Sequence, residues 1–120
     1  MDSAIMNNFL SQLWQDQALF ILALDVNGRV TYANAKAQQR FGDPAGTLVG
    51  ANWFDIAVLP EDQSTVRRRF RAMMDGEMEN LLQISDVDVM AADGARLRIL
   101  WSNHLLRDSR GAVTGLLSFG

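Results

Sequence analysis

The chain contains no cysteine and a single histidine, His104. The absence of cysteine excludes disulfide bonds, thiolate metal ligands and cysteine nucleophiles, and it fits a reducing compartment. A single imidazole excludes any metal site that needs two histidines from one chain. We therefore expect no metal-binding residues and a cytoplasmic location.

The sequence also lacks a long apolar run and a strong net charge. No run of about 18 apolar residues occurs, and the first residues, MDSAIMNNFL, lack the basic and then apolar order of a signal peptide. The formal net charge is −3, whereas a nucleic-acid partner favours a basic surface. These absences predict no direct membrane insertion and no nucleic-acid partner.

Signatures of enzymes are missing as well. The sequence has no phosphate-binding glycine loop and no Ser-His-Asp signature around its one histidine. Acidic residues are plentiful, but spacing alone does not pair two of them as a general acid and base. We therefore expect no catalytic residues, and a small enzyme with a pocket in a conical barrel is a remote alternative.

What the sequence does have is the composition of one folded domain. Its 120 residues, of which 48% are hydrophobic and 21% charged, suffice for a single hydrophobic core. Residues 1–17 show the pattern of an amphipathic helix, set apart from a domain over residues 18–120. We predict that this helix is a cap or dimerisation helix, which packs on the outer sheet face of a second copy. Its apolar stripe, the predicted dimer interface, consists of Ile5, Phe9, Leu13 and Trp14.

Residues 18–120 predict two strands, a group of helices and then three strands. Asn27-Gly28 is a strong hairpin signal, because both residues accept positive φ. Pro60 opens the clearest helix. The predicted strands are Leu19 to Asp25, Arg29 to Ala33, Leu81 to Met90, Arg96 to Leu106 and Ala112 to Phe119. The predicted helices are Ala35 to Phe41, short turns over Asp43 to Asn52 and Trp53 to Val58, and Pro60 to Asp75.

This order describes an α+β domain with one five-stranded antiparallel sheet, helices on one face of it and an N-terminal amphipathic helix. Alternation along the fourth strand places Ile99, Trp101 and Asn103 on one face, together with Leu97 and Leu105. The aliphatic side chains of that set need burial, so this is the predicted inner face. His104 then points outward.

Three segments carry a resemblance to a known family. DVNGRVTYAN (Asp25 to Asn34) is similar to the opening hairpin of PAS domains. LVGANWFDIAVLPED (Leu48 to Asp62) resembles the segment that follows, in which a glycine precedes short helices and Pro-Glu-Asp opens the long one. DGARLRILWSNHLLRDSRGAVTGLLSFG (Asp93 to Gly120) looks like the closing hairpin. Each motif is short, and the specificity of the resemblance comes from their order and spacing.

The resemblance implies a cupped sheet whose inner face encloses a pocket with the helices. Such domains bind haem, flavin or small metabolites there, or bind nothing and act through dimer contacts. They usually precede an effector in the same polypeptide, such as a histidine kinase of a two-component system or a diguanylate cyclase. The implied function is a sensory input domain of a larger signal-transduction protein. A ligand-free module for homodimerisation or protein interaction is the alternative.

The predicted pocket combines aromatic and apolar side chains with one buried amide, Asn103. A buried asparagine needs a hydrogen-bond partner, which a ligand, a backbone group or a water molecule could supply. The predicted ligand-binding residues are Trp53, Phe54, Phe70, Met73, Ile99, Trp101 and Asn103.

The cofactor stays unknown, apart from two exclusions. Photochemical flavin-binding relatives need a cysteine after the short helices, where this chain reads Gly50-Ala51-Asn52-Trp53. Haem-binding relatives take an axial histidine from the long helix, where this chain has none, and core packing is the commoner role of Met73 and Met74. Non-covalent flavin stays open, as does a domain without a cofactor. Flavin-binding relatives often place an asparagine near the end of the preceding strand. This chain has Asp88-Val89-Met90 there, which weakens the case for flavin.

We predict that the purified protein shows neither a haem Soret band nor a photocycle, because the required histidine and cysteine are missing. Absorption spectra recorded before and after illumination check both expectations. A Soret band that survives changes at Met73 and Met74 but is lost with His104 would contradict the assignment of His104 to the outer face.

Overall fold

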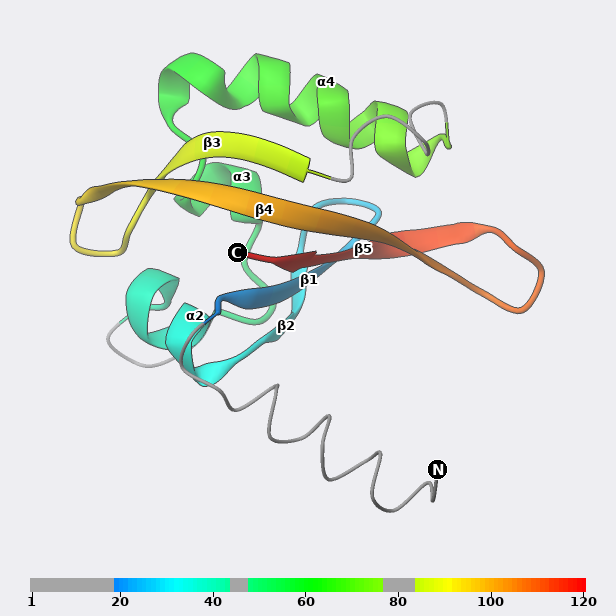
Figure 1. Ribbon diagram of the computed structural model, residues 1–120, viewed down its shortest axis with the longest axis horizontal. Helices are drawn as coiled ribbons and strands as arrows, with labels where there is room; N and C mark the ends of the chain where they lie inside the picture. Colours follow the sequence, from blue (N-terminus) through cyan, green and yellow to red (C-terminus); the bar gives the residue numbers. More distant parts are fainter. Residues whose placement is uncertain (1–18, 44–47, 77–83) are drawn as a thin grey trace.

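The described residues, 19–43, 48–76 and 84–120 of a computed structural model, form a five-stranded antiparallel sheet with helices against it (Figure 1). The strand order is β2-β1-β5-β4-β3. The strands are β1 (Ile21–Asp25), β2 (Val30–Ala33), β3 (Ile84–Met90), β4 (Arg96–Arg107) and β5 (Val113–Phe119). The helices are α2 (Ala35–Phe41), α3 (Trp53–Ile56), the 3₁₀ turn η1 (Pro60–Asp62) and α4 (Gln63–Met74).

This architecture confirms the predicted α+β fold and its order of strands and helices. Three predicted stretches lie outside the described ranges: the helix over residues 1–17, residues 44–47 of the predicted helical turns and residues 81–83 of the third predicted strand. The helix expected from Pro60 begins as the 3₁₀ turn η1 and becomes α-helical at Gln63. It gives way at Gly76, whose φ of +77° suits a glycine after a helix end. Within the described ranges, every helix is too short or too polar to span a bilayer.

The short helical turns expected over Asp43 to Asn52 are wrong for residues 48–52 of that segment. The Gly50 N–H donates to the Val30 carbonyl at 2.8 Å, and the Val30 N–H donates to the Ala51 carbonyl at 2.9 Å. These bonds tie the segment to the start of β2. Pairing with a strand therefore replaces helix here, and α3 begins only at Trp53.

The β1–β2 and β4–β5 hairpins close with the same kind of turn. The Asp25 carboxylate accepts two backbone N–H groups at 2.9 and 3.0 Å, and Gly28 has φ +85°. The Asp108 carboxylate likewise accepts two backbone N–H groups at 2.9 and 3.0 Å, and Gly111 has φ +83°. Positive φ favours glycine, and a short acidic side chain can satisfy the N–H groups of its own turn.

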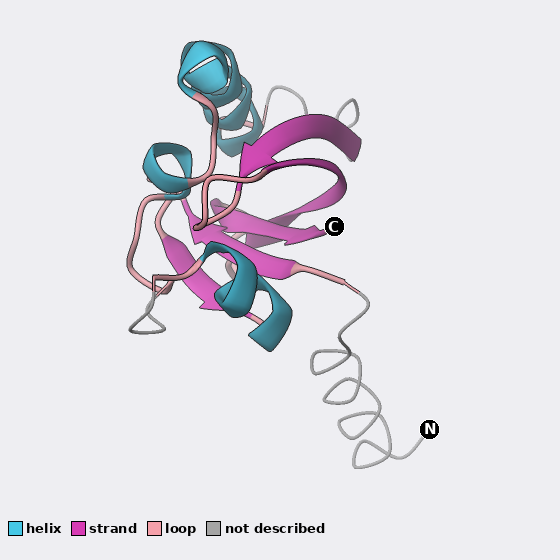
Figure 2. Ribbon diagram, turned by 90° about the vertical axis from the view of Figure 1, so that its left-hand side faces the viewer, coloured by secondary structure: helices cyan, strands magenta, loops and turns pink. Residues whose placement is uncertain are grey.

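The helices gather on one side of the sheet, which divides it into an inner and an outer face (Figure 2). On β4 the side chains of Ile99, Trp101 and Asn103 are buried, whereas Leu100 and His104 are exposed. The predicted face assignment of this strand is therefore confirmed. The pleat produces it, because successive side chains of a strand point to opposite faces.

A close contact between the first hairpin and α3 fixes that helix over the sheet. A Cβ atom added to Gly28 would lie 2.3 Å from the Phe54 ring. The Trp53 N–H also donates to the Gly28 carbonyl at 2.9 Å. The turn thus has room for no side chain at this position. The core that these contacts help to enclose consists of Leu22, Leu24, Val30, Ala37, Phe41, Leu48, Trp53, Phe54, Ala57, Val58, Phe70, Met73, Val89, Ala91, Ile99, Trp101 and Leu116.

Asn34 joins three elements through one buried side chain. Its Oδ1 accepts the N–H groups of Ile21 at 3.2 Å and of Ala37 at 3.0 Å. Its Nδ2 donates to the Leu19 carbonyl at 2.8 Å. The side chain therefore caps α2 and holds the start of β1 beside the end of β2.

We predict that Asn34→Ala lowers the free energy of unfolding by about 2–3 kcal/mol, because it removes a helix cap and leaves buried backbone groups unpaired. Asn52→Ala is the matched control, since Asn52 caps α3 at a partly exposed position and should cost about 1 kcal/mol. Urea unfolding followed by circular dichroism measures both. Equal losses, or a larger loss for Asn52→Ala, would contradict the role given to Asn34.

Candidate functional site

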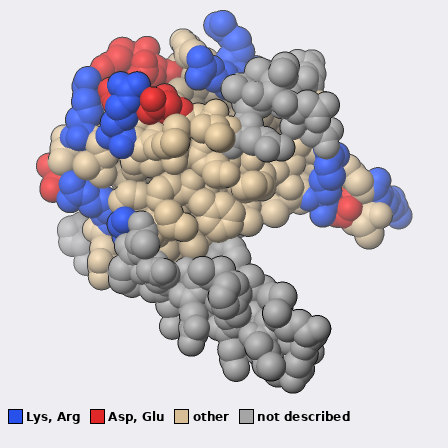
Figure 3. Space-filling model, in the orientation of Figure 1, with Lys and Arg blue, Asp and Glu red and all other residues tan. Residues whose placement is uncertain are grey.

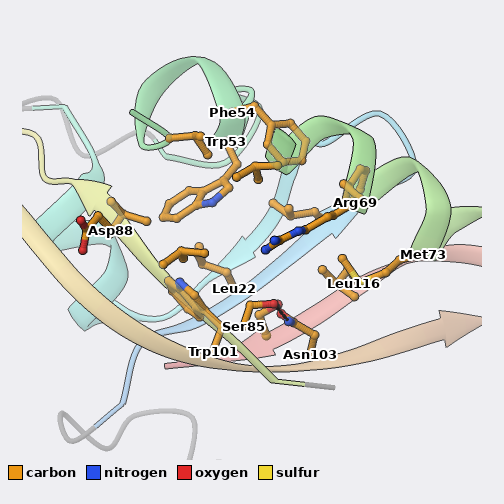
Figure 4. A pocket seen from close by; sticks show the side chains of 17 residues that line it. Leu22, Trp53, Phe54, Arg69, Met73, Ser85, Asp88, Trp101, Asn103 and Leu116 are labelled. Atoms are coloured by element: carbon orange, nitrogen blue, oxygen red, sulfur yellow. Dashed lines mark hydrogen bonds between the residues drawn. The ribbon is translucent and has the colours of Figure 1, made fainter. Parts of the chain in front are cut away.

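A cavity of about 80 Å³ lies between the inner face of the sheet and the helices α3 and α4 (Figure 4). Strands β1, β5, β4 and β3 supply one side of it, and α3 and α4 supply the other. Most of its lining is apolar. The lining residues are Leu22, Leu24, Trp53, Phe54, Val58, Val66, Arg69, Phe70, Met73, Ser85, Val87, Asp88, Val89, Trp101, Asn103, Leu116 and Ser118.

The size of the cavity decides which ligands fit it. Pockets for drug-sized ligands measure about 300–1,000 Å³, and a cavity of about 150 Å³ accepts benzene. A space of about 80 Å³ therefore holds a few water molecules or a ligand of few heavy atoms. The arrangement of side chains leaves no room for the rings of a flavin or a haem, so the residues do not fit either group. His104, on the outer face, bonds to Ser102 at 2.9 Å.

A chain of three polar side chains, which we call the polar floor, crosses the cavity on the sheet side: Ser118, Asn103 and Ser85. The Ser118 hydroxyl donates to Asn103 Oδ1 at 2.7 Å, and Asn103 Nδ2 donates to Ser85 Oγ at 2.8 Å. These residues lie on β5, β4 and β3, which are neighbours in the sheet. The buried amide thus has side-chain partners. The sequence pattern alone does not predict these two serines as its partners.

An aromatic wall closes one end of the site. The Trp101 ring lies 5.9 Å from the Trp53 ring and 6.3 Å from the Phe20 ring, measured between centroids. Phe41 stands 5.0 Å from Trp53 and 5.2 Å from Phe20, which completes the group. Edge-to-face and tilted contacts of this kind add to the burial energy of the rings. They also hold Trp101 and Trp53 in place at the cavity.

Two charged residues, Arg69 and Asp88, line the cavity in the described structure. Figure 4 shows the Arg69 side chain reaching from α4 into the cavity, whereas the Asp88 carboxylate points away from the other labelled side chains. Arg69 is exposed to solvent over much of its surface. It therefore stands where the cavity meets the surrounding water.

The carboxylates of β3 act on Arg98 of β4. Asp86 accepts two hydrogen bonds from the Arg98 guanidinium, both at 3.0 Å, and these bonds hold the pKa of Asp86 below its usual value. The pKa of Arg98 is raised, first by the hydrogen bonds to Asp86 and then by the charges of Asp86 and Asp88. The charge of Asp88 thus stabilises the protonated form of Arg98, which does not line the cavity.

The structure brings together most of the residues that the sequence singled out. Trp53, Phe54, Phe70, Met73, Trp101 and Asn103 line the cavity, whereas Ile99 is buried in the core but does not line it. The sequence reasoning missed Ser85, Ser118 and Arg69. Strand alternation could have pointed to Ser118, which shares a face with Leu116. No local signal marked Arg69 as different from its arginine neighbours.

The outer face of the sheet is largely uncharged. Figure 3 shows this face, with the charged side chains gathered mainly at its edges. Ile84 and Leu100 are 60% and 62% exposed there. The predicted dimer residues lie outside the described ranges: Ile5, Phe9, Leu13 and Trp14. In the described part of the chain, no group of three His, Asp or Glu side chains is arranged to hold a metal ion.

Solved structures share this fold at low sequence identity. The PAS domain of a protein from Colwellia psychrerythraea has a TM-score of 0.75 at 15% identity, covering 96% of this chain and 93% of that one. VqmA bound to DPO has a TM-score of 0.70 at 19% identity, covering 95% of this chain and 56% of VqmA. The PAS domain of the quorum-sensing receptor RpfR from Cronobacter turicensis, in complex with BDSF, has a TM-score of 0.63 at 17% identity, covering 84% and 90%.

The relation to VqmA has two consequences. This chain spans about half the length of VqmA, so it is similar to one part of that protein. VqmA of Vibrio cholerae is also known in a complex with a ligand and DNA. The expectation that nucleic acid is not a partner therefore finds no support in these neighbours.

The sequence itself identifies the family. Comparison with curated protein sequences gave no match. The sequence profile of the PAS fold, in contrast, matches residues 15–120, which include all the described strands and helices. The chain therefore belongs to the PAS fold family.

Proposed function

We propose that this chain is the sensory input domain of a larger signalling protein and that its cavity binds a small molecule. The observation that supports this most directly is the cavity itself, an apolar space with a polar floor between the sheet and α4. Apolar pockets with a few convergent polar groups are the usual form of small-molecule sites. Two structures with a similar fold have been solved as complexes, VqmA bound to DPO and the RpfR PAS domain in complex with BDSF.

The packing of Trp101 suggests how binding would be passed on. Trp101 lines the cavity, and its ring is so close to Gly120 that a Cβ there would lie 2.6 Å from a ring carbon. Phe20 and Gly120 exchange two backbone hydrogen bonds of 2.8 Å. A ligand that shifts Trp101 would therefore shift the segments just before β1 and just after β5. We propose that an effector in the same polypeptide, of the histidine kinase or diguanylate cyclase type, reads this shift in the cytoplasm.

Membership of the PAS fold family supports a regulatory role, because these domains are in general sensory modules. The cavity adds nothing to the case for an enzyme: among its described lining residues Asp88 is the sole carboxylate, and its side chain points away. General acid–base chemistry needs groups that converge on the reacting atoms. Catalysis, if the whole protein performs any, would belong to the effector.

A ligand-free dimerisation module is the second candidate, and the outer sheet face favours it. Ile84 and Leu100 expose apolar side chains on that face, and the polar floor is already paired within itself. We propose that the protein is a homodimer in which the helix predicted over residues 1–17 packs against this face. Dimerisation and ligand sensing are compatible, since they use opposite faces of the sheet.

For ligand binding, we predict that the protein retains a small molecule after incubation with a metabolite extract and removal of the excess. Native mass spectrometry should show an added mass that disappears on denaturation. Leu116→Phe, which fills the cavity, should abolish the added mass, whereas Leu117→Phe, on the next residue of β5 but pointing to the other face, should keep it. An unmodified native mass for the unaltered protein in every extract tested would favour the ligand-free candidate.

For assembly, we predict that Leu13→Glu converts the proposed dimer to a monomer, because it places a charge in the apolar stripe of the helix predicted over residues 1–17. Gln12→Glu makes the same charge change on the polar side of that helix and should leave the dimer intact. Light scattering coupled to gel filtration gives the mass of each variant. If Leu13→Glu remains dimeric, the proposed interface is wrong.

A further inference from the structure

We propose that the cavity binds short-chain carboxylates, with Arg69 as the residue that pairs with the carboxylate group. This inference rests on the proposed function, because it names the chemical class of the ligand for the same cavity. Three observations support it: a cation at the cavity opening, hydrogen-bond donors on the polar floor that are not used, and an apolar space of limited volume.

Arg69 is placed to meet an anion that enters the cavity. It follows Val66 by three positions and precedes Met73 by four on α4, so all three side chains lie on neighbouring parts of one helix face. Its side chain extends into the cavity (Figure 4). Among the described residues, the arginines in ion pairs are Arg40, Arg67, Arg96 and Arg98. Arg69 is not one of them, so its guanidinium has no competing carboxylate there.

The polar floor offers further donors and no negative charge. An amide nitrogen carries two N–H groups, and Asn103 uses one of them for Ser85. The Ser85 hydroxyl accepts that bond and keeps its own hydrogen for donation. In the described structure these two donors form no further hydrogen bond. Asn103 is only 7% exposed, so its second N–H has little access to bulk water. An acceptor inside the cavity would satisfy this buried donor.

The charge balance of the cavity favours an anion over a neutral or cationic ligand. Asp88 lines the cavity, but its carboxylate points away and its charge acts on Arg98. The guanidinium of Arg69 is always protonated and matches a carboxylate with parallel N–H groups. A cationic ligand would meet this positive charge without a carboxylate aimed at it.

The volume limits the rest of the ligand. A cavity of about 150 Å³ accepts the six carbons of benzene. The space of about 80 Å³ between Leu22, Leu116 and Met73 therefore suits an apolar tail of roughly three or four carbon atoms. Long acyl chains and ring systems are too large. Butyrate, which is ionised at neutral pH, is the simplest probe of this size and charge.

The test compares butyrate with butyramide, which has the same shape without the charge. Each is titrated into the full chain at pH 7, with ionic strength held constant by sodium chloride, and binding is followed in ¹H–¹⁵N correlation spectra. The indole N–H of Trp101 reports on the cavity wall. We expect butyrate to bind about tenfold more tightly than butyramide, since a hydrogen bond to a charged group at a partly exposed site contributes at the lower end of its range.

Arg69→Gln and Arg68→Gln form the matched pair of variants. Both remove one positive charge from neighbouring exposed positions of α4, but Arg68 does not line the cavity. We expect Arg69→Gln to remove the preference for butyrate and Arg68→Gln to keep it. Arg69→Lys should retain part of the preference, because it keeps the charge but not the paired N–H geometry.

The failures of this inference and of the proposed function are distinguishable. Equal binding of butyrate and butyramide, or a preference that survives Arg69→Gln, overturns the role of Arg69 and leaves a ligand-binding cavity. If neither butyrate nor butyramide binds, the proposal of a short-chain carboxylate ligand is wrong. A molecule retained from the metabolite extract would then still support a sensory cavity. If no probe binds and no extract leaves a mass, both proposals fail.

Discussion

The polar floor of Ser118, Asn103 and Ser85 ties together the three strands that carry the sheet side of the cavity. Its three side chains lie in an apolar interior, where an unpaired polar group is destabilising, so each must face the next across the sheet. Asn103 and Ser118 are directly opposed in the β4–β5 register. A slip of one residue would turn Asn103 to the outer face and leave both serines without it. The two hydrogen bonds therefore specify the register of three strands as well as satisfy the amide.

The cavity follows from the same choice of residues. Serine is small, so two of the three floor positions leave space that leucine would fill. Phe70 and Met73 of α4 line the same space. Phe54 packs against Phe70 with ring centroids 4.9 Å apart, which joins α3 to α4 above the space. Protein interiors are otherwise close-packed. An unfilled space beside unused donors is thus a local exception, consistent with a binding role.

The sheet separates the two functions that we propose for the domain. The inner face carries the cavity, and the outer face carries exposed apolar side chains, among them Leu100. Trp101 is the next residue of β4 and points the other way, into the cavity and toward Gly120. A change at the inner face can therefore reach the ends of the domain and the outer face through one strand. Such coupling requires that a ligand bind the shifted arrangement better than the original one.

Most of the helices and strands and the direction of the β4 side chains could be predicted from the sequence, because these depend on local rules. Asn27-Gly28 set a hairpin, and alternation placed Trp101 and Asn103 inside. The partners of those residues depend on contacts between elements far apart in the chain, which local rules do not predict. The sequence did not predict Ser85 and Ser118 as partners of Asn103, because cross-strand register joins residues 18 and 15 positions apart. Ile99 shares the inner face with Trp101 but lies in the core outside the cavity lining, because a shared face does not fix which positions along the strand border the cavity. Arg69 could not be told from its arginine neighbours, because the rotation of α4 over the sheet arises from long-range packing.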